Sequence, residues 1–434
     1  MGPASSWRID YLASVRFVHV DSTGVRAQLR FAVLAFGLAL TVTACSGPTG
    51  GDPQPVPTQV VQTTAIASTT SPIPATVLSP DPDPDPDPAL APAPSPTPAP
   101  TPTPAATESI GPSSTDVRWS NGDVFVGGTL TIPAGDPLDL PAPAVLLIAD
   151  GGGADRDWVS EAIPGINGSG RMIANELTDA GYITLRYDRR GTGRRTGVTR
   201  PSDGENFLKD SVDEVSSAIE YLRSRPEVDR ARIFSVAHDE GALHALLRES
   251  QSTQSDISGM ALLAPSALTL KQQVFRKLGV FAEGPGDERL LASFDAAMAL
   301  FIEGTPPEGD LRLSPDLQAL FENLTYPSNQ PYNSEIWNLE VTPLLQGFSG
   351  PVLVLIGQLD TDVDWAEEGQ IWRGAAGSGQ DLELVQPLNT DHVLMATLPD
   401  ASETGFITYN AFGRTLDDES MTSLLDWLNS LSGL

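Results

Sequence analysis

Cysteine is almost absent from this chain, because its 434 residues include only one, Cys45. A single cysteine excludes an intramolecular disulfide and the paired cysteines of structural zinc sites. Histidine is also scarce, since the chain has four and those beyond residue 115 are dispersed. No phosphate-cradling loop or nicotinamide fingerprint precedes a suitable helix. We therefore expect no metal site and no cofactor.

Basic residues are few as well. The chain holds 26 Lys and Arg against 56 Asp and Glu, which gives a formal net charge of −30. An acidic protein repels phosphate, so nucleic acid is excluded as an expected partner. The length leaves room for one large domain or two of ordinary size, each with a substantial core. Composition leaves the oligomeric state open.

Residues 1–45 have the pattern of an export signal. Arg26 and Arg30 precede an apolar run at 31–42, and the small residues of VTAC lead into Cys45. About a dozen apolar residues fall short of the ~20 that span a bilayer, which disfavours a permanent transmembrane helix. The pattern resembles a bacterial lipobox, which implies cleavage before Cys45, a lipid on its sulfur and an extracytoplasmic protein anchored to the membrane. An ordinary secretory signal that contains a cysteine is the alternative.

Residues 46–115 consist largely of Pro, Thr, Ser, Ala and Asp, including the run DPDPDPDP. This composition cannot bury enough apolar surface to fold, and its prolines favour extended polyproline II. At ~3.1 Å per residue such a linker reaches on the order of 200 Å. We expect a disordered stalk that holds a folded domain, residues 116–434, away from the membrane.

The folded part alternates apolar runs with amphipathic stretches, which predicts an α/β fold with a mostly parallel sheet flanked by helices. Candidate strands span residues 124–131, 144–149, 183–187, 232–236, 260–263, 352–356 and 382–385. Helical patterns span residues 171–180, 207–223, 242–247, 366–374 and 418–431. In such sheets the loops beyond the carboxyl ends of the strands bind the ligand.

One block interrupts the alternation. Residues 267–346 lie between two predicted strands and contain several short helical patterns with proline-rich joints. A single crossover needs far fewer residues, so we expect a helical lid over the carboxyl end of the sheet. Two ordinary crossover helices with long loops are the alternative.

The segment AHDEG, residues 237–241, follows an apolar run and precedes a helical stretch. This is the place of the sharp GxSxG turn that exposes a nucleophile above a sheet, and here Asp239 stands in the place of the serine. The turn would put the backbone N–H of Glu240 at an oxyanion position. A second donor is expected from the loop DGGGADRD, in which Gly151 allows a close approach of the backbone to a ligand.

His392 is the expected partner base, because it follows the last predicted strand and precedes the terminal helix. Its acid is expected directly after the strand at 352–356, where Asp360 comes first. Asp362 and Asp364 are close enough to compete for this role. The alternative is a stray Asp-His pair on a surface loop. That alternative leaves unexplained why the pair occurs together with two other motifs in the expected chain order.

Several stretches together carry a family resemblance. In chain order they are LIADGGGADRDWVS, YDRRGTGRRTG, SVAHDEGA, PVLVLIGQLDTDV and a final DH. Over about residues 117–434 the chain resembles an esterase/peptidase-like branch of the α/β-hydrolase superfamily, near the dienelactone hydrolase and serine aminopeptidase groups. The resemblance implies an α/β-hydrolase fold and a small-molecule substrate.

Carried over by position, the resemblance implies that Asp239 is the nucleophile site and that Asp360 and His392 complete a triad. Gly151 and Glu240 would supply oxyanion-hole amides. Two positions depart from the pattern. The nucleophilic serine is Asp239, and the first glycine of the family stretch GSGPTDRD is Asp150.

The aspartate limits the chemistry. The resemblance implies a carboxylic-ester hydrolase, but a carboxylate that attacks an ester carbonyl forms a high-energy anhydride. At an sp3 carbon the same carboxylate forms an alkyl ester, as in epoxide hydrolases and haloalkane dehalogenases, and His392 could activate water against it. Tyr326 and Tyr332 lie in the segment that would supply acids for an epoxide oxygen, although core or surface positions explain them equally. Two alternatives are Asp239 as a general base and a non-catalytic, lipid-anchored binding module.

Overall fold

The structure is a computed structural model that describes residues 111–135, 140–151, 154–160, 163–190, 192, 207–279, 285–305, 313, 315–327, 329–377, 379–396 and 405–434. Cys45, the predicted export signal and nearly all of the predicted stalk lie outside these residues. Among the residues that are described, no helix combines the length and apolar character needed to cross a membrane.

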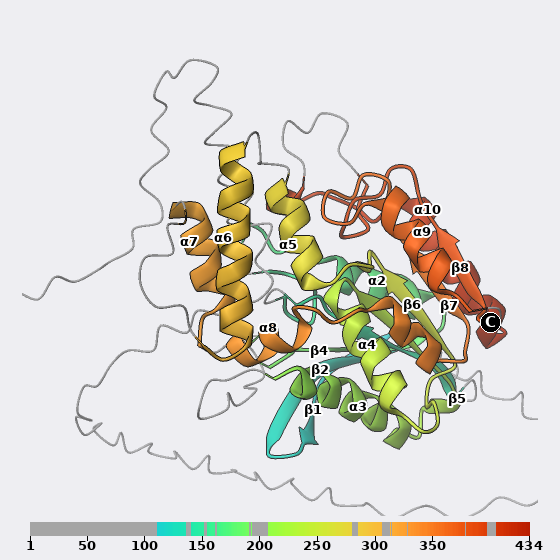
Figure 1. The fold of residues 1–434 in the computed structure, drawn as a ribbon. Helices are drawn as coiled ribbons and strands as arrows, with labels where there is room; N and C mark the ends of the chain where they lie inside the picture. The colour runs from blue at the N-terminus through green and yellow to red at the C-terminus, as the bar shows by residue number, and fades with distance from the viewer. Residues whose placement is uncertain are drawn as a thin grey trace, which may run out of the picture. The chain divides into compact units, whose positions relative to one another are not determined.

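Within the described residues the strands form one eight-stranded sheet in the order β1-β2-β4-β3-β5-β6-β7-β8 (Figure 1). The strands are β1 (Ser113–Asn121), β2 (Val124–Ile132), β3 (Ala142–Ile148), β4 (Ile183–Tyr187), β5 (Val228–His238), β6 (Gly259–Leu263), β7 (Val352–Leu355) and β8 (Leu382–Val385). β1 pairs with β2 and β2 with β4 in antiparallel fashion, and all the other pairs are parallel. The expected mostly parallel sheet is confirmed.

The first strand was not among the expected ones. β1 has the sequence SSTDVRWSN, and most of its residues are exposed at the edge of the sheet. Only two of its residues, Val117 and Trp119, pack on the core, and two positions are too few to show an alternation of apolar residues. The strand begins at Ser113, three residues before the predicted start of the folded domain at residue 116.

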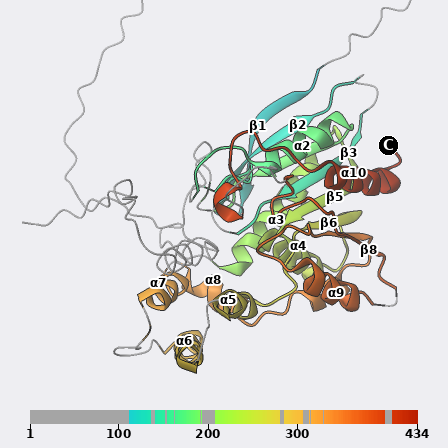
Figure 2. The ribbon, with the colours of Figure 1, turned by 90° about the horizontal axis from the view of Figure 1, so that it is seen from above.

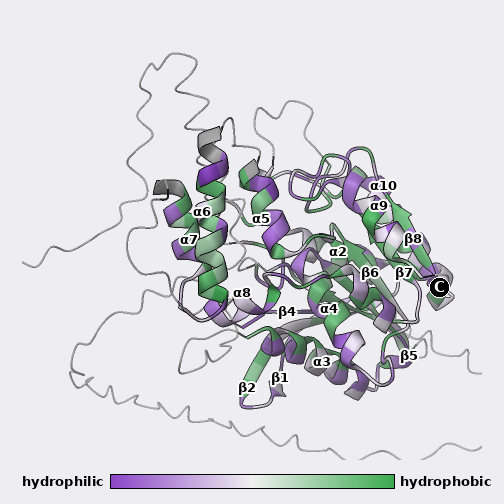
Figure 3. Cartoon of the chain, viewed as in Figure 1, coloured by the Kyte–Doolittle hydropathy of each residue, from purple (hydrophilic) through white to green (hydrophobic). Residues whose placement is uncertain are grey.

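Helices cover both faces of the sheet, because alternate residues of a strand point to opposite faces. Val145 and Leu147 of β3 belong to a core with α2 (Ser169–Asp179) and α10 (Asp418–Ser432). Leu146 and Ile148 belong to a second core with α3 (Leu208–Ser224), α4 (Glu240–Gln251) and α9 (Trp365–Ala375). Figure 2 shows these two groups of helices on either side of the sheet, and Figure 3 shows the hydrophobic strands between them.

The segment between β6 and β7 is helical, with the helices α5 (Leu270–Gly279), α6 (Pro285–Ile302), α7 (Pro315–Leu324) and α8 (Gln330–Ile336) and the 3-10 helix η2 (Thr342–Gly347). We call residues 267–346 the helical block. Edge-to-face aromatic pairs join its helices: Phe294 of α6 contacts Phe275 of α5 at 6.0 Å and Phe321 of α7 at 6.3 Å between ring centroids. These phenylalanines belong to or pack against the same hydrophobic cluster as Leu146 and Ile148 of β3, so the block packs onto the core of the sheet.

Candidate active site

The turn between β5 and α4 has the geometry of a nucleophile elbow. Asp239 has a φ of 43° and a ψ of −114°, a strained conformation for a residue with a side chain. Its N–H donates to the Leu263 carbonyl oxygen at 3.0 Å, which ties the turn to β6. A Cβ on Gly241 would lie 2.6 Å from the Ala149 carbonyl oxygen, so only glycine allows α4 to start this close to β3. The turn lifts the side chain of Asp239 above the sheet.

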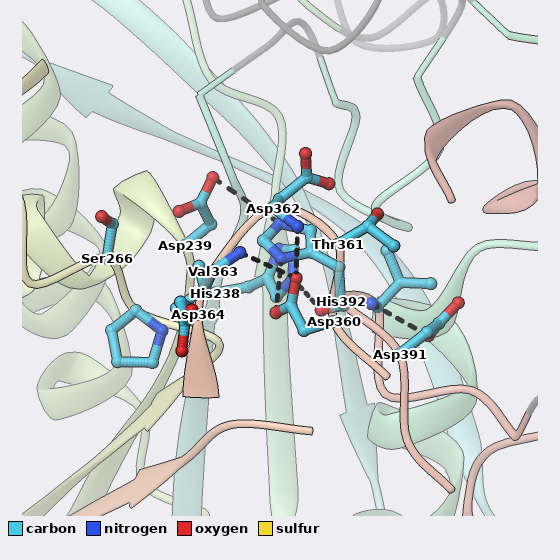
Figure 4. A network of polar contacts seen from close by, with 12 residues as sticks. His238, Asp239, Ser266, Asp360, Thr361, Asp362, Val363, Asp364, Asp391 and His392 are labelled. Carbon is cyan, nitrogen blue, oxygen red and sulfur yellow. Dashed lines mark hydrogen bonds and ion pairs between the residues drawn. The ribbon is translucent and has the colours of Figure 1, made fainter. Parts of the chain in front are cut away.

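The structure brings Asp239, His392 and Asp360 together (Figure 4). His392 Nε2 lies 3.7 Å from Asp239 Oδ2, and Nδ1 on the other side of the ring lies 2.9 Å from Asp360 Oδ2. The other oxygen of Asp360 accepts the N–H groups of Asp362 and Val363 at 2.8 and 2.9 Å. Asp360 is thus fixed by its own loop and orients the imidazole toward the elbow.

The two competing acids are occupied elsewhere. Asp362 pairs with Lys277 of α5 at 3.0 Å and accepts the Tyr409 hydroxyl at 2.6 Å. Asp364 caps α9 by accepting the N–H groups of Ala366 and Glu367. Of the three candidates, Asp360 is the one that is hydrogen-bonded to His392.

Asp360, Asp362 and His392 each place one donor atom within 4.8 Å of the others, a spacing that a metal ion could bridge. Their hydrogen bonds argue for another use. The imidazole already binds Asp360, and the ammonium group of Lys277 already compensates the charge of Asp362. A cation at this place would have to break the His392–Asp360 pair and lie beside a lysine.

Asp239 and His392 form an ion pair. Burial opposes both charges, but Asp360 and Asp239 together raise the pKa of His392 well above its ordinary value. Against the same cost of burial, attraction to His392 lowers the pKa of Asp239. The resting site therefore holds an ionised aspartate next to an imidazolium.

His238 is a buried support that sequence reasoning left without a role. Its Nε2 binds the carbonyl oxygen of His392 at 2.8 Å, and its ring stacks on Trp158 with 5.0 Å between centroids. Burial, and then the charge of His392, lower the pKa of His238 to about 4, so the ring is neutral at pH 7. The place of His238 in the sequence, directly before Asp239, already indicated that this histidine lies near the site.

Asp150 lies beside Asp239 because of the sheet register. β3 and β5 are parallel neighbours with Ile148 opposite Ala237, and each aspartate follows two residues later. The carboxyl group of Asp150 accepts the N–H of Gly151, so the expected oxyanion donor already has a partner. Burial, and then the charges of Asp239 and Glu240, raise the pKa of Asp150 well above its ordinary value.

Glu240 is buried beneath the elbow, and its N–H lies at the start of α4 as expected. Its carboxylate accepts the Tyr332 hydroxyl at 2.7 Å and lies 3.5 Å from Arg189. A Cβ on Gly151 would collide with this carboxylate, so glycine is required there. Arg189 also donates to the carbonyl oxygen of Asp150 at 2.8 Å. This network fixes the loop after β3 to the elbow and to the helical block.

The two tyrosines proposed as acids for an epoxide oxygen are placed differently. Tyr332 is buried in the network beneath Glu240, where His244 also binds its hydroxyl at 2.6 Å. Tyr326 is 46% exposed. Neither side chain is among the described residues that line the cavity at Asp239.

Two cavities meet at Asp239. The larger, of about 70 Å³, has charged residues and apolar side chains in its lining, among them Asp150, Asp239, His392, Asp362, Lys277, Trp158, Ile163, Val393 and Phe406. The smaller, of about 30 Å³, shares Asp239 and Gln273 with the first. Its apolar lining comes from Leu243, Leu268, Leu270, Ile336, Leu339 and Val341, most of which belong to the helical block. The block thus contributes walls to both cavities.

Comparisons with known proteins agree with this geometry at the level of the family. The profile described as "Alpha/beta hydrolase family" matches residues 145–402, which is more than half of the chain. No curated protein matches the sequence.

Solved structures that align with the chain include an esterase from Pyrococcus furiosus, with 18% identity over 74% of this chain and 92% of that one at a TM-score of 0.46. An alpha/beta hydrolase from a Penicillium species aligns with 16% identity over 75% of this chain and 100% of that one at a TM-score of 0.44. A hypothetical protein from Pseudomonas aeruginosa aligns with 14% identity over 76% and 96%, at a TM-score of 0.45.

Proposed function

The chain belongs to the alpha/beta hydrolase family, and on that premise we propose that it is a hydrolase of small molecules with an electrophilic sp3 carbon, such as epoxides or alkyl halides. The reaction passes through an alkyl ester on Asp239. The observation that carries this proposal is the ion pair between Asp239 and His392 at a nucleophile elbow.

The nucleophile favours this chemistry. An ionised carboxylate attacks a saturated carbon and yields an ester, which water can cleave, whereas attack on an acyl carbon yields an anhydride. Asp239 is held in its ionised form because attraction to His392 overcomes the cost of burial and lowers its pKa. It is therefore ready to attack without a base.

The protonation state of His392 suits a base in the second step, ester hydrolysis, better than a base in the first step, alkylation of Asp239. Because Asp239 and Asp360 raise the pKa of His392, the resting ring is protonated and cannot take a proton from water or from a nucleophile. Alkylation of Asp239 removes one of these two negative charges. The pKa of His392 then falls, and the neutral ring becomes the base that activates water against the ester. Alkylation of Asp239 by the substrate thus converts His392 into the base of the second step.

The cavities favour a substrate with one polar and one apolar part. The reacting group would lie in the larger cavity with Asp239 and His392. An apolar substituent would fit the smaller cavity, whose leucines, isoleucine and valine adjoin the same aspartate. Burial of apolar surface contributes roughly 25 cal/mol per Å², so a short hydrocarbon group suffices to orient the substrate.

The test is a mass measurement on Asp239 with styrene oxide and benzyl bromide as probes. In wild-type protein, one turnover in ¹⁸O-water should place the label in the Asp239 carboxylate, because water attacks the ester carbonyl. In His392→Gln the ester should accumulate and add the mass of the alkyl group. Asp239→Asn is the matched control, which should carry no adduct.

Two other outcomes are distinguishable. Hydrolysis of p-nitrophenyl acetate without label in Asp239 would overturn the covalent route and favour Asp239 as a general base. No turnover and no adduct with any probe would favour a binding module that uses the same cavities. Ligand binding without chemistry would then be expected to survive His392→Gln.

We also propose that the protein is exported and anchored through a lipid on Cys45. The basic residues, apolar run and VTAC sequence before this cysteine support the proposal. Wild-type protein expressed in a bacterium should sediment with membranes and dissolve in detergent, whereas Cys45→Ala should be recovered in the soluble fraction. Membrane association that survives Cys45→Ala would contradict lipid anchoring.

A further inference from the structure

We propose that Asp150 is a catalytic acid that gives its proton to the departing oxygen while Asp239 attacks the carbon, which assigns epoxides rather than alkyl halides as the substrate class. This inference rests on the proposed function. It adds a residue that the family pattern does not supply, since the family stretch GSGPTDRD has a glycine where this chain has Asp150.

The geometry places Asp150 in the cavity that would hold the epoxide oxygen. Asp150 and Asp239 follow adjacent parallel strands in the same register, so their side chains enter the same cavity side by side. In-line attack by Asp239 leaves the ring oxygen on the adjacent carbon, on the side of the ring away from the attacking carboxylate. A proton donor for that oxygen must therefore line the same cavity as Asp239, as Asp150 does.

The backbone around Asp150 is fixed. Arg189 donates to its carbonyl oxygen at 2.8 Å, and the guanidinium group is itself held near Glu240. The N–H of Gly151 donates to one carboxyl oxygen of Asp150, which leaves the other oxygen to carry a proton toward the cavity. A carboxyl group that follows a strand directly and whose own backbone is bound by an arginine keeps its position during a reaction.

The protonation state of Asp150 agrees with this role. Burial, followed by the charges of Asp239 and Glu240, raises its pKa, and the opposing charges of His392 and Arg189 do not cancel that effect. Two neighbouring carboxyl groups with pKa values shifted in opposite directions divide the work of acid and nucleophile.

Among the other donors in the cavity, the imidazolium of His392 is paired with Asp239 and Asp360, and Lys277 and Tyr409 are bound to Asp362. Lys277 pairs with this carboxylate at 3.0 Å, and the Tyr409 hydroxyl donates to it at 2.6 Å. The tyrosines of the helical block are placed elsewhere, because Tyr332 binds Glu240 and Tyr326 does not line the cavity. Asp150 is thus the acid that adjoins the nucleophile.

The proton balance closes over one turnover. A carboxylate oxygen of Asp239 bonds to a ring carbon, the carbon–oxygen bond of the ring breaks, and its electron pair takes the proton of Asp150. Asp150 is left as a carboxylate and recovers a proton from the imidazolium of His392, whose pKa has fallen with the charge of Asp239. Water then attacks the ester carbonyl and gives one proton to His392. Collapse of the adduct releases a diol, whose oxygen takes the remaining hydroxyl proton and leaves Asp239 ionised.

A halide leaves as an anion and needs no proton, so two probes isolate the acid. The experiment measures the rate of adduct formation on Asp239 in the His392→Gln background, where esters accumulate. Asp150→Asn, which keeps the shape of the side chain, should slow labelling by styrene oxide about 100-fold or more and leave labelling by benzyl bromide within about threefold. Asp150→Gly, which restores the family residue, should show the same selective loss.

The matched control is Asp155→Asn in the same loop. Asp155 accepts the N–H groups of Asp157 and Val159 and lies outside the cavity lining, so its loss reports a disturbed loop alone. In this control the rate of labelling by styrene oxide, divided by the rate of labelling by benzyl bromide, should stay at the value of the His392→Gln parent.

The pH dependence gives a second measurement. In the parent protein the same ratio should fall as the pH rises through the pKa of Asp150, and in Asp150→Asn it should be independent of pH. The groups that face Asp150, namely Asp239, Glu240, His392 and Arg189, affect both probes.

Four results would overturn the role of Asp150. Equal slowing of both probes in Asp150→Asn would show a structural effect only. An unchanged rate with styrene oxide would exclude proton donation. If bromide labels Asp239 and the epoxide does not even with Asp150 present, the covalent function stands and the assignment to epoxides fails. Labelling by neither probe overturns the covalent function itself and, with it, this inference.

Discussion

The two halves of the active site differ in how far they follow the family pattern. The half after β7 and β8 holds an Asp-His pair with the expected order, hydrogen bond and supports. The half after β3 and β5 carries three acidic residues, Asp150, Asp239 and Glu240, where the pattern has a glycine, a serine and a residue that matters only for its N–H. We call these the relay half and the attack half.

This difference indicates which part of such a site can change when the reaction changes. The relay half acts on water or a nucleophile and has the same task in every variant of the reaction. The attack half contacts the substrate, so replacing a hydroxyl with a carboxylate changes which carbon can react. In this chain the change does not stop at Asp239, because the carboxyl group of Asp150 lies next to it and the pKa values of the two are shifted in opposite directions.

The largest expected effect on the difference between the two halves comes from removing the acid of the relay half, Asp360. Asp360→Asn should lower the rate of diol formation about 10³-fold or more, because His392 loses the charge and hydrogen bond that orient it. The ester on Asp239 should accumulate, since only the second step needs the base. Steady-state rates and the intact mass of the protein measure both effects.

Asp362→Asn is the matched control for this prediction, because Asp362 lies in the same loop but binds Lys277 and Tyr409. We expect its rate to change less than about tenfold. A greater loss in Asp362→Asn than in Asp360→Asn would reassign the acid of the relay half.

A second prediction converts the attack half back to the family pattern. Asp239→Ser removes one of the two carboxylates that raise the pKa of His392, so the ring can act as a base toward the serine. Esterase activity should still be weak, because the carboxyl group of Asp150 accepts the N–H of Gly151. The double variant with Asp150→Gly should hydrolyse p-nitrophenyl acetate about 100-fold faster, the usual value of one oxyanion donor. Equal rates in the single and double variants would show that Gly151 is not an oxyanion donor.

The smallest expected effect is on stability. Because the pKa of Asp150 is raised in the folded state, its contribution is fully present below the unfolded pKa and is lost as the pH rises through the folded value. Asp150→Asn avoids this loss, so it should raise the melting temperature by a few degrees at pH 8 and have little effect at pH 4. The exposed Asp123→Asn is the control. A destabilised Asp150→Asn at pH 8 would contradict the assigned protonation.

Most of the fold was predictable from local patterns. The buried parallel strands are short apolar runs, and the expected ranges 183–187 and 382–385 coincide with β4 and β8. Each of the five expected helices overlaps an observed one by nearly its whole length or falls within it. β1 was missed because its stability comes from pairing with β2 at an exposed edge, and that contact leaves no pattern in nine mostly polar residues.

The site was predictable as far as chain order determines it. Asp239, Asp360 and His392 each follow a strand, so their convergence required only the fold. The roles of Asp150 and Tyr332 required more. The proximity of Asp150 to Asp239 depends on the register of β3 against β5, and the contact of Tyr332 with Glu240 depends on how the helical block packs. Neither register nor packing between distant elements is encoded in a local pattern.

The position of Asp239 between two unlike cavities has a stereochemical consequence. Asp150 lines only the larger cavity, whereas Leu243, Ile336 and Val341 line only the smaller one. A substituted three-membered ring that fills both must present one of its carbons to the nucleophile with a fixed handedness. Its mirror image would point the hydrocarbon group toward the acid. Racemic starting material should therefore be resolved kinetically, with one enantiomer consumed and the other left behind.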